Sequence, residues 1–170
     1  MKQLYQAIWQ LLHTEEAIKA FTGQHLRPPE YMDLYDGQPE EEEKFEFTVP
    51  ALFIDYSIAW EKAGTMRKGE LTLEIHVLTD PTPETDNLTE NFRGMEKVDY
   101  YEIISDLLEG LSTSETSGLV LKSERPVSTD YFNYHLLVFT CTISRRRTYV
   151  TEGAILKVDV KPPKYVLPEL

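Results

Sequence analysis

The sequence predicts an α+β fold: a mostly antiparallel sheet of four to five strands with two helices packed on one face. Three observations predict it. Apolar and polar residues alternate strictly through residues 70–77 of the stretch 69–80, which is typical of a strand with one face on a core. Two other stretches, residues 2–13 and 98–111, show the apolar spacing of amphipathic helices. The larger apolar residues of 52–60 also alternate with the residues between them, as in a strand.

The first helix is expected over residues 2–13, and Thr14 is suited to cap a short continuation through Phe21. Gly23 then ends the helical region. Residues 27–44 follow as a long loop, and a loop of this length in a compact domain is functional or mobile. The inward stripe of the first helix consists of Leu4, Ile8, Leu11 and Leu12.

The first strand is expected over residues 45–60. Pro50 has no N–H to give to a sheet ladder, so it indicates an edge or a bulge. Beyond Pro50, the larger apolar residues of the strand alternate with the rest as far as Trp60. A turn at residues 62–68 connects this strand to the alternating strand over residues 70–78. The two strands therefore form a predicted antiparallel hairpin.

The second helix is expected over residues 98–111, with Asp99 and Glu102 as its capping pair. Its apolar stripe should lie across the sheet. Gly110 and the polar residues after it end this helix. The stripe consists of Tyr101, Ile104, Leu107, Leu108 and Leu111.

Two long strands are expected after this helix, over residues 119–127 and 131–145, with a turn between them. Residues 136–139 are apolar on both faces, which favours an interior strand. A further short strand is expected over residues 154–160.

The 170 residues, 41% of them hydrophobic, are enough for one domain with a proper core. We expect this domain to span residues 1–147. Residues 148–170 form a C-terminal arm, because Pro162, Pro163 and Pro168 favour extended chain over helix. No signal peptide or membrane-spanning stretch is visible, so a soluble protein made and used inside a cell is expected.

Most of the net charge of −12 lies in two predicted loops. Residues 30–47 carry eight acids and one lysine, and residues 80–96 carry five acids and one arginine. Residues 145–170 reverse the sign, with six bases and three acids. Unlike charges on one chain favour head-to-tail matching between copies. Solvated loops kept for solubility would have the same composition.

The sequence has one basic cluster, the three adjacent arginines at residues 145–147, at the end of a predicted strand. Such arginines usually pair with acids of the same or a neighbouring chain, and one cluster does not favour tight binding to nucleic acid. Net acidity instead suits a channel through which DNA slides. The residues expected at contacts with other copies or partners are Arg145, Arg146, Arg147, Glu40, Glu41, Glu42, Glu43, Asp86 and Glu90.

No catalytic residue, metal ligand set or cofactor is expected. The glycines form no nucleotide-binding motif, and neither a GxSxG nor an HExxH sequence is present. Glu74 and His76 share the outer face of one strand, where they could supply two ligands of a metal site. With no third ligand in view, a solvated strand face is the simpler interpretation. His135 is expected to be a packed sheet residue. Cys141, the only cysteine, is expected to be buried as a small apolar residue.

The element order carries a family resemblance over roughly residues 1–147. It consists of the N-terminal helix, the long loop, a strand opening with Pro-Ala-Leu-Phe-Ile at residues 50–54, the alternating strand at 70–78, the helix at 98–111 and two closing strands. This order resembles that of the tail terminator proteins of long-tailed bacteriophages, also called minor tail or tail-completion proteins. The acidic loop at 27–44 and the segment after residue 147 depart from that pattern.

The resemblance implies a non-enzymatic structural virion protein. Such proteins form a hexameric ring that caps the tail tube, ends tail growth and joins the tail to the head. The implied partners are further copies of the chain, the tail tube protein and a head–tail connector protein. DNA would pass through the lumen without specific binding, and no membrane is involved. Assembly would take place in the host bacterial cytoplasm, where a prophage is an implied source, before the protein resides in the virion tail.

Three alternatives are left open, the first of them also a structural protein and the other two from different classes. The first is another head–tail connector or neck ring, which would bind portal-side rings rather than tube ends. The second is a stand-alone acidic binding module, which would be a stable monomer with one basic protein partner. The third is an enzyme that uses Glu74, His76 and His135, for which the metal content of the purified protein is the discriminating measurement.

Overall fold

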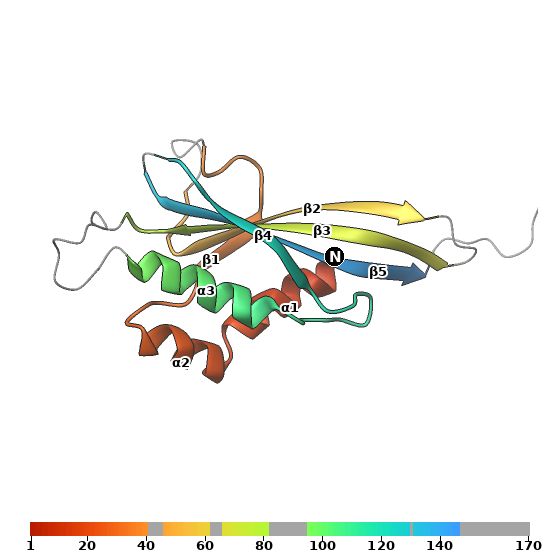
Figure 1. Ribbon diagram of the computed structural model, residues 1–170, viewed down its shortest axis with the longest axis horizontal. Helices are drawn as coiled ribbons and strands as arrows, with labels where there is room; N and C mark the ends of the chain where they lie inside the picture. Colours follow the sequence, from red (N-terminus) through yellow and green to blue (C-terminus); the bar gives the residue numbers. More distant parts are fainter. Residues whose placement is uncertain (41–45, 62–65, 82–94, 130, 147–170) are drawn as a thin grey trace, which may run out of the picture.

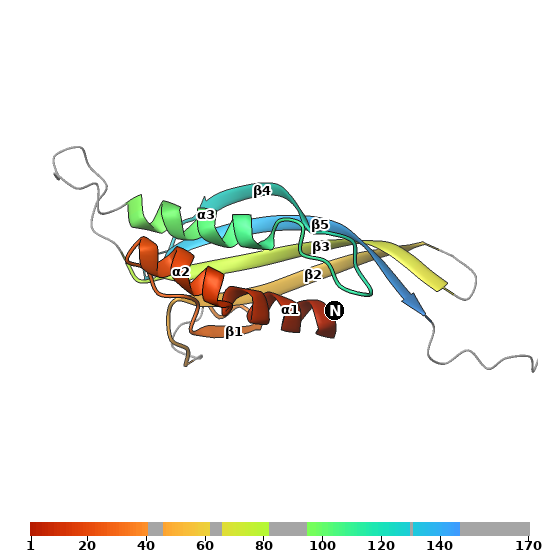
Figure 2. The same ribbon diagram turned by 90° about the horizontal axis from the view of Figure 1, so that it is seen from below.

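The computed structural model describes residues 1–40, 46–61, 66–81, 95–129 and 131–146. A five-stranded sheet in the order β1-β2-β3-β5-β4 is antiparallel except for the β1–β2 pair. Three helices lie on one side of this sheet (Figures 1 and 2). The α+β prediction is therefore confirmed. The elements are α1 (Lys2–Leu12), α2 (Glu15–Gly23), β1 (Tyr31–Leu34), β2 (Ala51–Glu61), β3 (Met66–Thr79), α3 (Glu96–Leu108), β4 (Val120–Val127) and β5 (Asn133–Arg146).

Thr14 separates α1 from α2. Its hydroxyl oxygen accepts a hydrogen bond from the Ala17 N–H at 3.2 Å, and the hydroxyl donates to the Leu11 carbonyl at 2.9 Å. The predicted cap is confirmed, and α2 ends at Gly23 as expected. Because the cap starts a separate helix, the helical layer has one helix more than the two predicted.

Helix α3 begins at Glu96, earlier than the sequence predicted. Met95 precedes it, and no side chain caps its first N–H groups. The predicted capping pair is wrong because Asp99 and Glu102 both lie inside the helix. Asp99 is in the first turn, where a carboxylate is stabilised by the positive end of the helix dipole. The expected inward stripe is confirmed by the burial of Tyr101, Ile104 and Leu108.

Strand β1 lies within the stretch predicted to be a loop, and it runs parallel to residues 51–54 of β2. The Tyr35 N–H donates to the Ile54 carbonyl at 3.0 Å and continues the ladder by one residue. A strand of four residues is too short to show a convincing alternation. Its only strand partner is distant in the chain, so the sequence pattern held no signal for it.

Pro50 stands directly before β2, which begins at Ala51 and therefore later than predicted. The Pro50 carbonyl accepts a hydrogen bond from the Glu30 N–H at 2.8 Å. In this position the missing N–H leaves no ladder hydrogen bond unmade. The residue thus marks the start of the strand rather than an edge or a bulge within it.

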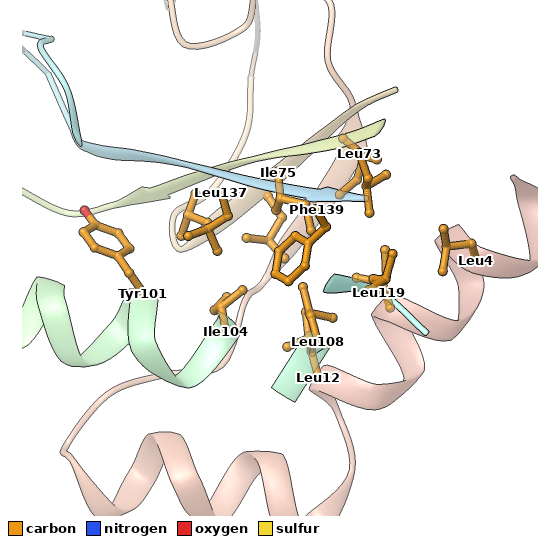
Figure 3. Packing of buried hydrophobic residues seen from close by; sticks show 14 of the residues in the cluster. Leu4, Leu12, Leu73, Ile75, Tyr101, Ile104, Leu108, Leu119, Leu137 and Phe139 are labelled. Carbon is orange, nitrogen blue, oxygen red and sulfur yellow. The ribbon is translucent and has the colours of Figure 1, made fainter. Parts of the chain in front are cut away.

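The main core lies between the helices and the sheet (Figure 3). Its side chains are almost inaccessible to solvent, and burying a Leu, Ile or Phe side chain stabilises the fold by roughly 1.5–3 kcal/mol. Cys141 belongs to this core, as predicted. The labelled members in Figure 3 are Leu4, Leu12, Leu73, Ile75, Tyr101, Ile104, Leu108, Leu119, Leu137 and Phe139.

Strand β5 lies between β3 and β4, which confirms the interior strand predicted from its apolar residues. Leu136 and Leu137 point to opposite faces, and both are buried. A second, smaller core therefore exists on the sheet face away from the helices, called here the far face. It consists of Ala51, Phe53, Leu78 and Tyr134, covered by Tyr31, Tyr35, Phe47, Val49, Val127 and Phe132.

Within the described parts of the chain, no helix is both long and apolar enough to cross a bilayer. The expected strand at residues 154–160 and the C-terminal arm lie outside the described residues. The domain boundary at residue 147 stays a prediction for the same reason.

Candidate assembly interface

The sheet is longer than the helices that cover it. Strands β3 and β5 have 14 residues each, which corresponds to ~46 Å. Helix α1 has 11 residues and α3 has 13, which corresponds to only ~16 and ~20 Å. Figure 1 shows the ends of β2, β3 and β5 projecting beyond the helical layer. Among the described elements, no helix therefore covers this end of the sheet.

The projecting hairpin, defined as residues 55–61 of β2 and 66–70 of β3, carries large exposed apolar side chains. Tyr56 is 42% exposed, Trp60 40% and Met66 41%. Tyr56 and Trp60 lie on the same face of β2 as the buried Ile54, because alternate residues share a face. This face is core at one end of the strand and surface at the other. An apolar surface of this kind is typical of a contact site.

Gly69 positions the indole of Trp60, its direct neighbour across the hairpin. A Cβ atom on Gly69 would lie 3.2 Å from Cε3 of Trp60 and 2.6 Å from the carbonyl oxygen of Ala59. The ring therefore packs over bare backbone, where only glycine leaves room for it. The exposed tryptophan is held in place by the strand opposite.

The tip of the sheet is basic. Arg145 lies directly opposite Arg67, and both side chains are exposed. No ion pair joins either of them to an acid within the described residues. Like charges directly opposite each other in a sheet are destabilising, so an anionic partner would relieve this repulsion.

The other expected contact residues are distributed as follows. The backbone of Arg146 pairs opposite Met66 at the same tip. Glu40 lies near the covered end of the sheet, where its carboxylate accepts a hydrogen bond from the Tyr35 hydroxyl at 3.0 Å. The remaining ones, Arg147, Glu41, Glu42, Glu43, Asp86 and Glu90, lie outside the described residues.

Glu40 and Arg145 are far apart in one subunit. The Tyr35 ring that binds Glu40 stacks on His76 at 4.0 Å, and His76 is opposite Leu136 of β5. Arg145 is nine residues further along β5, which corresponds to ~30 Å. The acidic and basic surfaces therefore lie toward opposite ends of the sheet, and contact between them requires two copies.

His76 is buried, which makes the predicted solvated strand face wrong at this position. The segment after β1 covers it: Tyr35 stacks on the imidazole, and Nδ1 is hydrogen-bonded to the Tyr134 hydroxyl. Burial lowers the pKa of His76 to about 4; the positive charge of Arg125 adds to this effect and Asp55 opposes it. The imidazole is therefore neutral near pH 7.

Burial also raises the pKa of Tyr35 to about 12, and its hydrogen bond to the Glu40 carboxylate acts in the same direction. Both rings of the stacked Tyr35–His76 pair are thus uncharged in the folded state. The far face is therefore covered at this end by two uncharged rings, although both belong to residues that can titrate.

His135 is packed into the sheet, as predicted. Its ring stacks on Tyr101 at 4.2 Å, and Nε2 lies 3.6 Å from a carboxylate oxygen of Glu124. Burial lowers the pKa of His135, and Glu124 opposes this shift. These residues line an open pocket of about 550 Å³ between α3 and the β4–β5 hairpin.

The three residues of the enzyme alternative do not form one site. His135 packs on the helix side of the sheet, against Tyr101 of α3. Glu74 and His76 share the opposite face, as the sequence predicted. Within the described residues, no group of three potential metal ligands comes together.

The far face is bare beyond the second core. Register places the acids Asp55, Glu61, Glu70 and Glu74 there, together with the bases Lys68 and Arg125, among side chains that end in hydroxyl groups. In Figures 1 and 2 the three helices lie on the other side of the sheet. Four acids and two bases give this surface a net charge of −2, and a net negative surface repels phosphate. The hydroxyl side chains are those of Ser57, Thr72, Thr140, Thr142 and Ser144.

No family model and no curated protein matches the sequence. A solved structure described as "Virion of native gene transfer agent (GTA) particle" contains a chain of similar fold, with a TM-score of 0.51 and 16% sequence identity. The match covers 84% of the present chain and 95% of the virion chain. At this identity the likeness establishes a shared fold, and it extends over nearly the whole of the virion chain.

Proposed function

We propose that the protein is a structural component of a phage-like virion that forms a ring on the end of the tail tube, ending tail growth and joining tail to head. The observation that carries the proposal is the fold shared with a chain of a virion particle, over 84% of this protein and 95% of that chain. The order of elements, which resembles that of tail terminator proteins, supports the finer role. In this role the protein is not an enzyme.

The distribution of charge supports a ring. A closed ring of identical subunits needs two unlike surfaces that fit each other on neighbouring copies. Arg67 and Arg145 provide a basic surface at the tip of the sheet, and Glu40 lies toward the opposite end. The proposed contact joins these surfaces head to tail, together with the acidic residues that follow Glu40 in the sequence.

The properties of the far face support a role as the wall of a channel along which DNA moves. The acids Asp55, Glu61, Glu70 and Glu74 outnumber the bases Lys68 and Arg125 on this surface, and hydroxyl side chains lie among them. Phosphate is repelled by such a surface, so DNA would slide past it without sticking. Specific contacts to DNA are not required in this role.

The decisive experiment is to measure the mass of the purified full chain by light scattering and to image it by negative stain, alone and with tail tubes. Rings with a central hole that sit on one end of the tubes are the expected result. Rings that bind portal-side rings and leave tube ends bare would instead favour the neck-ring alternative. A monomer that ignores tubes and binds one basic protein tightly would favour the acidic binding module.

Arg145→Glu tests the proposed contact because it should act in opposite directions on the subunit and on the ring. In the subunit it replaces a repulsive Arg67–Arg145 pair by an attractive one, so the free energy of unfolding should stay level or rise by up to ~1 kcal/mol. In the ring it places an acid against an acid, so assembly should weaken at least about tenfold.

Lys19→Glu is the matched control, because Lys19 is an exposed cation on α2, away from the tip. Sedimentation measures assembly, and chemical denaturation measures subunit stability. Unchanged assembly of the Arg145 variant would remove the basic tip from the proposed contact.

A further inference from the structure

Strand β2 has an open backbone edge along its projecting half. The Ile54 carbonyl points toward β1, where it accepts the Tyr35 N–H at 3.0 Å. Backbone groups of alternate residues point to the same edge, so Tyr56, Ile58 and Trp60 direct their N–H and C=O groups away from β3. Strand β1 pairs only with residues 51–54, and no other described segment pairs with this edge.

The open edge lacks the usual protection of an edge strand. Residues 55–61 contain neither lysine nor proline, which natural proteins use to prevent pairing at an edge. The register with β3 runs without a bulge from Ala51 to Glu61. Tyr56 and Trp60 flank one side of this edge and are exposed. A straight, apolar and unpaired edge of ~23 Å favours the addition of another strand.

The sequence of the C-terminal arm contains a segment that fits this edge. In residues 154–160, Leu156, Val158 and Val160 alternate with Lys157 and Asp159, which is the pattern of a strand with one apolar face. Tyr56, Ile58 and Trp60 have the same spacing on β2. With Val158 beside Ile58, the two apolar triplets share one face of the sheet.

The charges fit in the same register. With Val158 opposite Ile58, an antiparallel strand places Lys161 opposite Asp55, and a parallel strand places Lys161 opposite Glu61. Both directions therefore pair this lysine with an acid. Residues 154–164 carry three lysines and one aspartate, whereas the open edge carries Asp55, Glu61 and no base. The segment and the edge thus have complementary net charges.

We propose that residues 154–160 of one copy add as a strand to the open edge of β2 in a neighbouring copy. This proposal rests on the ring assembly proposed above and identifies what links adjacent subunits. It assigns a role to the arm and to the exposed residues of the projecting hairpin. Main-chain hydrogen bonds supply affinity in such contacts, and the alternate side chains supply register.

A neighbouring copy fits better than the arm of the same chain. A strand that only pairs with the edge leaves the face of Tyr56 and Trp60 open to solvent, and both are at least 40% exposed. A second subunit brings its folded body together with its arm, so it can cover this face as well as the edge. Strand β5 ends with Arg146 at the projecting end of the sheet (Figure 2), so the described part of the chain ends on the same side of the molecule as the open edge.

Cysteine cross-linking of mixed full-length chains tests the proposal. One chain carries Ile58→Cys and the other Val158→Cys, because these positions are neighbours in both strand directions. Facing residues of adjacent strands have Cα atoms about 4.5–5.5 Å apart, within the range that a disulfide spans. The chains are mixed under assembly conditions, oxidised mildly and analysed on a non-reducing gel. The native Cys141 is buried and gives the background in wild-type chains.

Ser57→Cys mixed with Val158→Cys is the matched control, because Ser57 is one residue away on the opposite face. The expected result is a cross-linked species of two chains for Ile58 with Val158 and only background for Ser57 with Val158. Equal cross-linking of both pairs would overturn the registered strand.

A single chain with both Ile58→Cys and Val158→Cys tests whether the arm pairs with the open edge of its own subunit rather than with that of a neighbouring copy. If its disulfide forms within the chain at dilutions where mixed chains do not cross-link, the exchange between copies is overturned. Rings that form in the stained images without any Ile58–Val158 cross-link would also overturn it, while leaving the proposed ring function standing. Cross-linked chains that never cap a tail tube would instead support the exchange and reject the tail-terminator role.

Discussion

The two halves of β2 have the same alternation and the same partner strand, yet they meet different surroundings. Residues 51–54 are buried on both faces, because α1 and α3 cover one face and the second core covers the other. Tyr56 and Trp60, further along the strand, are at least 40% exposed. The difference shows that alternation decides which face a side chain takes, whereas the length of the covering layer decides whether that face is core or contact surface.

The largest effect is expected from Phe139→Ala in the covered half. Phe139 is completely buried on β5 between the sheet and the helices. Its truncation should lower the free energy of unfolding by ~3–5 kcal/mol, because the cavity collapses only partly. Chemical denaturation measures this loss. A loss below about 1 kcal/mol would show that this half of the sheet is not the stability core.

A pH-dependent loss is expected next, at the covered end of the far face. The pKa of His76 is about 4 in the folded state and 6.5 when unperturbed. As the pH falls below 6.5 the unfolded chain binds a proton that the folded chain does not, so the free energy of unfolding decreases until about pH 4. The decrease from this one group should reach at most about 3 kcal/mol.

His76→Phe keeps a ring against Tyr35 and removes the titrating group. Stability curves of both proteins at pH 6.5 and pH 4 isolate the contribution of His76, because the carboxyl groups titrate in both. An equal decrease in the two proteins would exclude His76 as its source. The oligomeric mass should respond differently to this pH change in the two proteins only if the covered end also contributes to assembly.

The smallest effect on the subunit, and a clear one on assembly, is expected from Trp60→Ala. The side chain is 40% exposed and packs over Gly69, so subunit stability should change by less than about 1 kcal/mol. At a contact between copies, loss of a central tryptophan typically costs ~2 kcal/mol or more, which is about thirtyfold in affinity. Light scattering over a concentration series measures it.

Ile18→Ala is the matched control, because Ile18 is 38% exposed on α2. It should leave assembly unchanged. Equal effects of the two variants would mean that exposure alone, rather than the position on the projecting hairpin, accounts for the loss.

Local patterns predicted much of the fold. The strict alternation of β3, the Thr14 cap and the inward stripe of α3 are all present. The start of α3 was placed too late because two acids in its first turns resembled a capping pair. Strand β1 was missed because four residues cannot show a period and its partner is distant in sequence. The missed strand is therefore the case in which the deciding interaction is not local.

The candidate site was predictable in part. The basic end of the last strand was visible in the sequence, and the structure places Arg145 opposite Arg67 at the tip. The exposure of Tyr56 and Trp60 was not visible, because a core strand and a contact strand have the same apolar spacing. The burial of His76 was hidden too, since the cover comes from Tyr35 in a stretch that showed only loop-like composition.

The sequence by itself determined the class of elements, their order, the two faces of each strand and the uneven distribution of charge, because these follow from residue spacing and composition. Only the tertiary structure decided that no described segment pairs with the outer edge of β2 beyond Ile54, that Glu40 and Arg145 lie toward opposite ends and that His76 is enclosed. The physical reason is that coverage depends on how long the packed layers are and which distant segments reach them. Neither quantity is encoded in the period of any single strand.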